Sequence, residues 1–114
     1  METTLKDLTI REALPSDTAI ILSFIKGLAK YEKMSDEVTA DEKKLFDSLF
    51  VKKEAFVLIA LEHDKPIGFA LYFKNYSTFL GQANMFLEDL FILEAYRKKG
   101  YGKAMFHALA TIAK

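Results

Sequence analysis

Three long apolar runs follow one another in the middle of the chain and constrain its fold more than any other feature. They are residues 55–61 (AFVLIAL), 67–73 (IGFALYF) and 85–93 (MFLEDLFIL). Each has the length and composition of a strand, so the sequence predicts three consecutive strands. The first two are separated by His63-Asp64-Lys65-Pro66, which predicts a hairpin. The polar stretch Lys74–Ala83 predicts a loop before the third strand.

Helical patterns lie on either side of these strands. Leu5–Ala13 predicts a first strand, and the stop and N-cap residues Pro15–Asp17 precede a helix that ends near Tyr31 to Met34. Thr39-Ala40-Asp41-Glu42 predicts a capping box that opens a second helix, with Thr39 as the N-cap. The basic stretch of residues 96–103 opens a last helix, which runs to the C-terminus. The predicted order is therefore strand, helix, helix, strand, strand, strand, helix.

The composition excludes several classes of protein. The 114 residues carry sixteen basic and sixteen acidic side chains and no cysteine. Zero net charge argues against a general nucleic-acid binder, and the absence of cysteine excludes disulfides and thiolate sites. Neither His63 nor His107 has a second ligand at metal spacing, so no metal is expected. We expect residues 1–114 to form one cytoplasmic domain with no membrane segment and no signal peptide.

Glu88 and Asp89 are adjacent carboxylates inside the third apolar run. Neighbouring residues of a strand point to opposite faces, so at least one of the two should face a covered surface of the sheet. A buried carboxylate is tolerated when it is paired, or when its raised pKa serves proton transfer. The alternative is a structural carboxylate that backbone amides or a lysine satisfy.

A basic, glycine-bearing turn opens the last helix. Gly100 and Gly102 allow close approach of the backbone to a ligand, and the free amides of a helix start favour an anion. Arg97, Lys98, Lys99 and Lys103 add positive charge, which makes the turn a candidate pyrophosphate cradle. It matches neither the P-loop nor the dinucleotide fingerprint. The alternative is a solvated helix start with ordinary turn glycines.

These two features, on a strand and the helix after it, carry a family resemblance. Residues 97–102 (RKKGYG) match the Arg/Gln-x-x-Gly-x-Gly/Ala turn of the GNAT superfamily of N-acetyltransferases, which the chain resembles. Residues 28–32, 76–81 and 86–91 resemble stretches of the spermidine/spermine (diamine) N-acetyltransferase group and its thialysine-acetylating relatives. The resemblance implies an α+β, GNAT-like fold with a mixed, mainly antiparallel sheet and helices on both faces.

The resemblance also implies an activity and a cofactor site. The chain would transfer an acetyl group from acetyl-CoA to a small primary amine, by direct attack within a ternary complex. Backbone groups of Leu90, Phe91 and Ile92 would pair with the pantetheine arm of acetyl-CoA. The pyrophosphate would be held by the turn and its basic side chains: Arg97, Lys98, Lys99, Gly100, Tyr101, Gly102 and Lys103.

Substrate roles follow from the same resemblance. Glu88 would face the amine and accept its proton, and Tyr31 and Glu32 would line the amine groove. Asp89, on the opposite face, is expected to be structural. Thr78 occupies a substrate position at which the polyamine enzymes have an acidic residue, so a long polycation is a less suitable substrate.

The resemblance further implies that the GNAT domain is truncated before its closing strands, since the chain stops at Lys114. We therefore expect a homodimer, or a partner chain that supplies the missing part and its tyrosine. Two alternatives to an enzyme remain at this point. One is a non-catalytic CoA-binding or dimerisation module, and the other is an interaction domain that uses its open sheet edge.

Overall fold

The computed structural model describes residues 5–113. Its four strands are β1 (Leu8–Glu12), β2 (Phe56–Glu62), β3 (Lys65–Ser77) and β4 (Gln82–Ile92). Its α-helices are α1 (Thr18–Tyr31), α2 (Glu42–Phe46) and α3 (Tyr101–Ala113). Short helical turns lie at Pro15–Asp17, Ser35–Glu37, Asp47–Val51 and Glu94–Tyr96. Across residues 5–113, no helix has the length and apolarity that spanning a bilayer requires.

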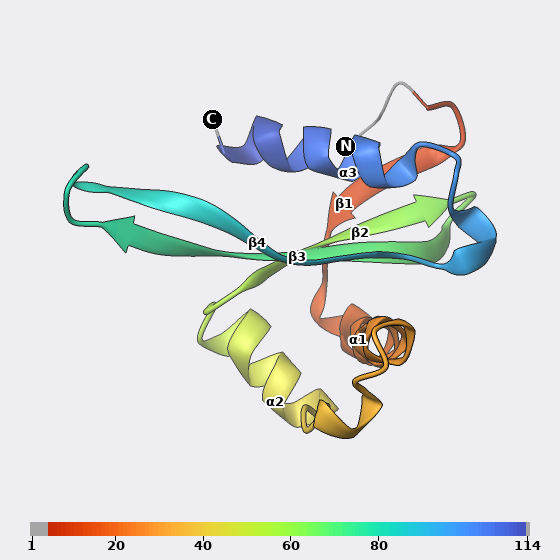
Figure 1. The fold of residues 1–114 in the computed structure, drawn as a ribbon, viewed down its shortest axis with the longest axis horizontal. Helices are drawn as coiled ribbons and strands as arrows, with labels where there is room; N and C mark the ends of the chain where they lie inside the picture. The colour runs from red at the N-terminus through yellow and green to blue at the C-terminus, as the bar shows by residue number, and fades with distance from the viewer. Residues whose placement is uncertain (1–4, 114) are drawn as a thin grey trace.

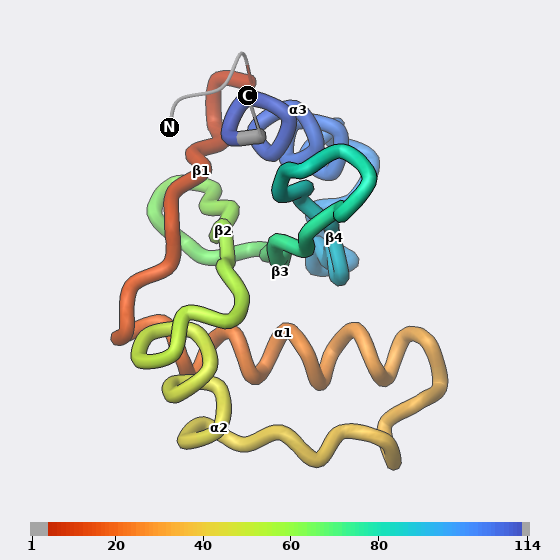
Figure 2. The backbone as a smooth tube through the Cα atoms, turned by 90° about the vertical axis from the view of Figure 1, so that its left-hand side faces the viewer, coloured from red at the N-terminus to blue at the C-terminus, as the bar shows by residue number. Residues whose placement is uncertain are grey.

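The strands form one antiparallel sheet in the order β1-β2-β3-β4. Helix α3 covers one face of the sheet, whereas α1 and α2 cover the other (Figures 1 and 2). The predicted hairpin between β2 and β3 is confirmed, and its turn is only His63 and Asp64, both at positive φ (49° and 67°). Two-residue hairpin turns of this kind need positive φ at both positions. The α+β architecture with helices on both faces is as predicted.

Each face of the sheet has its own apolar core. On the α3 face, Ile10, Leu58 and Tyr72 pack with Met105 of the helix. On the α1 face the buried aromatic rings of Phe24, Phe69 and Phe91 are in contact, with Phe24 stacked on Phe69 at a centroid distance of 5.8 Å. Because both faces are covered, β2 reads as an almost unbroken apolar run rather than an alternating one.

The predicted loop Lys74–Ala83 is wrong, because most of it is strand. Pairing of β3 with β4 continues to Ser77↔Gln82, and only residues 78–81 connect them. This end of the hairpin extends beyond the rest of the sheet (Figure 1). No apolar face is required where a hairpin leaves the core, so its sequence is polar like that of a loop.

The start of α2 also differs from the prediction. The N-cap is Asp41 rather than Thr39, and its Oδ1 accepts a hydrogen bond from the Lys44 amide at 2.8 Å. An N-cap side chain bonds the amide two or three residues ahead of it, and Asp41 reaches Lys44 in this way.

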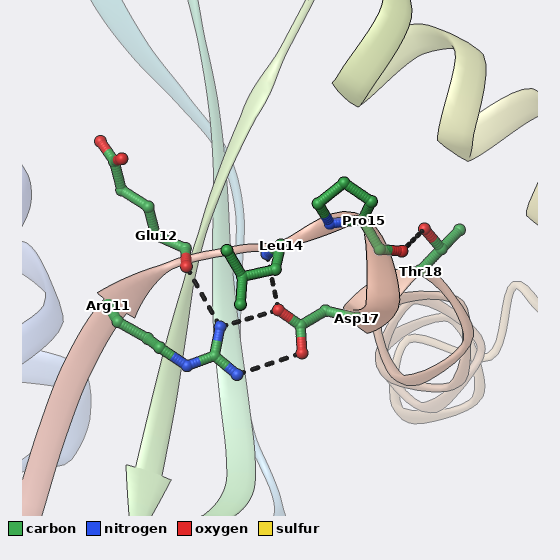
Figure 3. Close-up of polar contacts among 6 residues, drawn as sticks. All are labelled: Arg11, Glu12, Leu14, Pro15, Asp17 and Thr18. Carbon is green, nitrogen blue, oxygen red and sulfur yellow. Dashed lines mark hydrogen bonds and ion pairs between the residues drawn. The ribbon is translucent and has the colours of Figure 1, made fainter.

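An ion pair joins the end of β1 to the start of α1 (Figure 3). Arg11 donates two hydrogen bonds to the carboxylate of Asp17, from Nη1 at 2.7 Å and from Nη2 at 3.1 Å. The same carboxylate accepts the amide of Leu14 at 2.7 Å. Asp17 is buried, and these charge-assisted bonds lower its pKa, the Arg11 bond being the largest cause.

Candidate active site

A β-bulge in β4 decides where the two adjacent carboxylates lie. Leu71 pairs with Asp89 and Tyr72 pairs with Leu87, so Glu88 is an extra residue without a partner on β3. In a regular strand Leu87 and Leu90 would point to opposite faces. The bulge instead places both against the core under α3.

The bulge also gives the two carboxylates different surroundings. Glu88 is exposed, whereas Asp89 is half-buried and pairs with Leu71, which packs on the α1 face. Burial raises the pKa of Asp89, and the negative charges of Glu88 and Glu32 raise that pKa further. The carboxylate expected to face a covered surface is therefore Asp89. It belongs with Glu32 and Glu88 to one negatively charged region.

The C-terminal half of β4 presents a free outer edge. The amide of Leu93 bonds to the carbonyl of Ile67 at 2.8 Å, so Leu93 points its backbone towards β3. Because this direction alternates along an antiparallel strand, Phe91 also points to β3 while Leu90 and Ile92 point outward. The Ile92 carbonyl confirms the outward direction, since Arg97 Nε donates to it from outside the sheet at 2.8 Å.

The basic turn leads from this edge into α3 with an unusual backbone. Lys98 (φ 70°) and Gly100 (φ 80°) both lie in the left-handed region. Within residues 5–113, the first amide of this segment with a recorded backbone acceptor is that of Ala104, which bonds to Gly100 at 3.1 Å. The amides of residues 98–103 are thus available to an external acceptor, as at any helix start that lacks a cap.

A pocket of about 390 Å³ joins the outer edge of β4 to the turn. Its lining residues are Leu90, Ile92, Tyr96, Arg97, Lys98, Gly100, Tyr101 and Gly102. All of them except Tyr96 are residues that the sequence predicts to hold the cofactor. Phosphate groups bind well where free amides and cations meet at a helix start.

Two of the four predicted cations already have partners. The Arg97 guanidinium lies 4.7 Å from the ring centroid of Tyr31 and 5.5 Å from that of Phe91. Lys99 Nζ donates to Glu62 at 3.1 Å. Arg97 also occupies one face of the Tyr31 ring, which the sequence assigned to a substrate cation. Lys98 and Lys103 are exposed, with no side-chain partner recorded among residues 5–113.

Comparison with known proteins agrees with this geometry. A family model described as the acetyltransferase (GNAT) family matches residues 23–114. The chain belongs to the GNAT acetyltransferase family. In this GNAT chain, strand β4, the basic turn and helix α3 follow one another along the chain.

Relatives of this GNAT chain include proteins named as N-acetyltransferases or as similar to one. It is 34% identical over 113 residues to the thialysine N-epsilon-acetyltransferase of Sus scrofa, covering 91% of this chain and 66% of that protein. It is 31% identical over 120 residues to the human spermidine/spermine N(1)-acetyltransferase-like protein 1, covering 98% of this chain and 17% of the relative. The chain thus spans slightly less than two thirds of the pig enzyme that it matches.

A solved structure shows the same fold. An aminoglycoside acetyltransferase from an uncultured soil metagenomic sample superposes with a TM-score of 0.79 at 18% identity, covering 94% of this chain and 70% of that one. The sequence prediction of a GNAT-like fold is therefore confirmed.

Not every residue assigned from the sequence lies near the pocket of this GNAT chain. Thr78 is in the connection between β3 and β4, at the end of the sheet opposite the segment that leads into α3 (Figure 1). Its substrate role stays a prediction. Conversely, Glu62 contacts the turn, although no local sequence pattern marks it. Within residues 5–113 no group of three or more side chains is placed to hold a metal.

Proposed function

We propose that the chain is an acetyl-CoA-dependent N-acetyltransferase centre for a small primary amine such as a diamine, polyamine or lysine analogue. The observation that carries the proposal is the pocket between the outer edge of β4 and the free amides of residues 98–103. An extended pantetheine chain would pair with the outward backbone groups of Leu90 and Ile92 as an added strand does. The diphosphate would then meet the turn.

The amine side of the proposal rests on the bulge. Glu88 is exposed beside this edge, and Asp89 and Glu32 add negative charge that would attract an ammonium ion. An alkylamine reacts only as the free base, so Glu88 would accept a proton from the ammonium, directly or through water. Bound acetyl-CoA supplies an activated thioester. The amine nitrogen would attack the thioester carbon directly, so the amide bond would form as the carbon–sulfur bond breaks, and the thiolate of CoA would leave and take up the proton that the nitrogen releases.

The identity of the relatives supports this substrate class. The pig protein is named for thialysine acetylation and the human protein for its likeness to a spermidine/spermine enzyme. The test is thiol release from acetyl-CoA with a panel of thialysine, diaminopropane and spermidine, together with calorimetry for CoA. We expect thiol release with at least one short amine. Absence of CoA binding would overturn the proposal.

A second candidate is a CoA-binding or dimerisation module without turnover. It is favoured by β4 being the last strand of the sheet, with no strand on its outer edge among residues 5–113. An unpaired edge of this kind pairs readily with another chain. Binding of CoA without thiol release for any amine would support this candidate over the enzyme, and sedimentation analysis would then report whether two copies assemble.

A further inference from the structure

Glu62, the last residue of β2, contacts the basic turn from a distant part of the sequence. Its Oε2 accepts a hydrogen bond from Lys99 Nζ at 3.1 Å and a second, short one from the Tyr101 hydroxyl. The donors lie 37 and 39 residues further along the chain. A single oxygen atom therefore binds the two ends of a three-residue segment.

Each of the two donors directly follows a residue of the turn whose backbone is left-handed. Lys99 directly follows Lys98, and Tyr101 directly follows Gly100, the two residues with left-handed backbone conformation. For a lysine this conformation is intrinsically unfavourable, so contacts around it must maintain it. Glu62 supplies such contacts after both residues.

The hydrogen bond from Tyr101 to Glu62 is partly sheltered from solvent, whereas the one from Lys99 is exposed. Tyr101 is only 5% exposed and its ring packs in the core beneath α3, while the Glu62 side chain is 15% exposed. The hydrogen bond to Glu62 is the largest cause that raises the pKa of Tyr101 to about 12. The hydroxyl thus stays protonated and remains a donor throughout the neutral range.

The same contact fixes the position of the Lys99 ammonium group. Its ammonium group lies at Glu62 and within 5.3 Å and 5.9 Å of the ring centroids of Tyr96 and Tyr101. A cation held in this way stiffens the turn instead of reaching freely into solvent. The exposed side chains of Lys98 and Lys103 are left to meet an anion.

We propose that Glu62 is a positioning residue for CoA, because it holds residues 98–102 in the conformation that presents their amides to the diphosphate. Glu62 itself does not touch the cofactor. The inference rests on the proposed function, since it names the residue that preorganises the same pocket.

The test measures binding of CoA and of pantetheine, which lacks the diphosphate, to the 114-residue chain and to Glu62→Gln. We expect Glu62→Gln to weaken CoA binding by about tenfold, the effect of losing one charge-assisted hydrogen bond, and to leave pantetheine binding unchanged. Glu54→Gln is the matched control, because it removes the same charge from an exposed residue outside the pocket. It should bind both ligands like the parent.

Tyr101→Phe provides a second variant that retains the ring and removes only the hydroxyl. We expect it to weaken CoA binding and to leave pantetheine binding unchanged as well, and we expect the double variant to lose less CoA affinity than the two single losses added together, since both substitutions act on one contact. If Glu62→Gln does not fold, the CoA and pantetheine affinities of Tyr101→Phe relative to the parent test the positioning role. Equal CoA affinity in the parent and Tyr101→Phe, or equal weakening of CoA and pantetheine, overturns the positioning role alone. A parent chain that binds no CoA overturns this inference and the proposed function together.

Discussion

Glu88 takes its exposed position from the bulge, since without the extra residue it would share the α3 face with Leu90 and be covered. If it accepts the proton of the amine, Glu88→Gln should retain CoA binding and lower turnover by roughly 10²- to 10⁴-fold. The loss should be greatest below the pKa of the amine, where the substrate is an ammonium ion. Thiol release measured against pH checks this, with Glu54→Gln as the control. Unchanged turnover at every pH would remove Glu88 from the mechanism.

The half-buried position of the Asp89 carboxylate lowers the free energy of unfolding at neutral pH. Burial raises its pKa, so the folded protein binds this proton more tightly than the unfolded chain does. Stability is therefore lost as the pH rises from the ordinary pKa near 3.8 through the raised folded value. Asp89→Asn should be more stable than the parent at pH 7 and lose that advantage near pH 3. Urea unfolding at both pH values measures it.

The outcome for Asp89→Asn separates two roles. A carboxylate whose removal stabilises the fold is retained for a reason other than stability, which favours amine attraction. A less stable Asp89→Asn at pH 7 would instead restore the structural role that the sequence indicates. Glu88→Gln, at an exposed neighbour, should change stability little.

At the scale of elements, the contact of β3 with β4 depends on Gly68. A Cβ atom there would lie 2.5 Å from the Phe91 carbonyl oxygen and 2.6 Å from Ile92 Cδ1, so β4 would have to shift. Gly68→Ala should cost about 1–3 kcal/mol or more and lower the melting temperature correspondingly. Gly102→Ala is the control for stability, since its Cβ would meet only Leu90 at 3.9 Å. Equal melting temperatures for both variants would contradict the close packing.

The junction of β1 with α1 depends on the Arg11–Asp17 pair. Asp17→Asn should destabilise the protein by about 1–3 kcal/mol at pH 7, because it leaves the half-buried guanidinium without its carboxylate. The pKa of Asp17 is lowered by folding, so its contribution is present above the ordinary pKa near 3.8 and is lost as the pH falls through the lower folded value. Urea unfolding at pH 7 and pH 3 should show the difference shrinking, whereas Asp36→Asn, on the surface, should change neither midpoint.

Most elements could be predicted because their signals are local. A few neighbouring residues predict the hairpin turn at His63, and the basic turn likewise predicts that a helix begins there. The end of the β3–β4 hairpin could not be predicted as strand, because a strand that leaves the core has no apolar face to identify it. The N-cap of α2 was placed two residues early, since Thr39 and Asp41 are both good caps and sequence alone does not rank them.

The features of the candidate site also divide into those that the local sequence predicts and those that depend on the fold. The basic turn is contiguous in sequence and was predicted, as was the presence of a buried carboxylate within Glu88-Asp89. The bulge was not, because strand register depends on the partner strand. The contacts of Glu62 with the turn could not be predicted from the sequence either, since they join residues that are 37 and 39 positions apart. Local patterns thus identify the residues of the proposed cofactor region, whereas the contacts that Glu62 makes with them follow only from the fold.

At the scale of the whole molecule, zero net charge conceals a separation of charge. No acidic residue follows Glu94, whereas Lys98, Lys99 and Lys103 lie at the start of α3; the Arg97 guanidinium instead reaches Tyr31 at the end of α1. The acidic side chains of Glu32 and Asp89 are on the opposite, α1 side of the sheet. An anionic cofactor and a cationic amine would therefore approach the two sides of β4 along favourable fields.

This separation predicts how CoA binding responds to salt. Lys98 and Lys103 are exposed and have no side-chain partner among residues 5–113, so the double variant Lys98→Gln/Lys103→Gln should weaken CoA binding roughly threefold to tenfold and reduce its dependence on ionic strength. Lys99→Gln should change that dependence less, because the Lys99 charge is already paired with Glu62. Calorimetric titrations across a range of salt concentrations measure both slopes. A Lys99→Gln slope as shallow as that of the double variant would mean that Lys99 leaves Glu62 to meet the diphosphate.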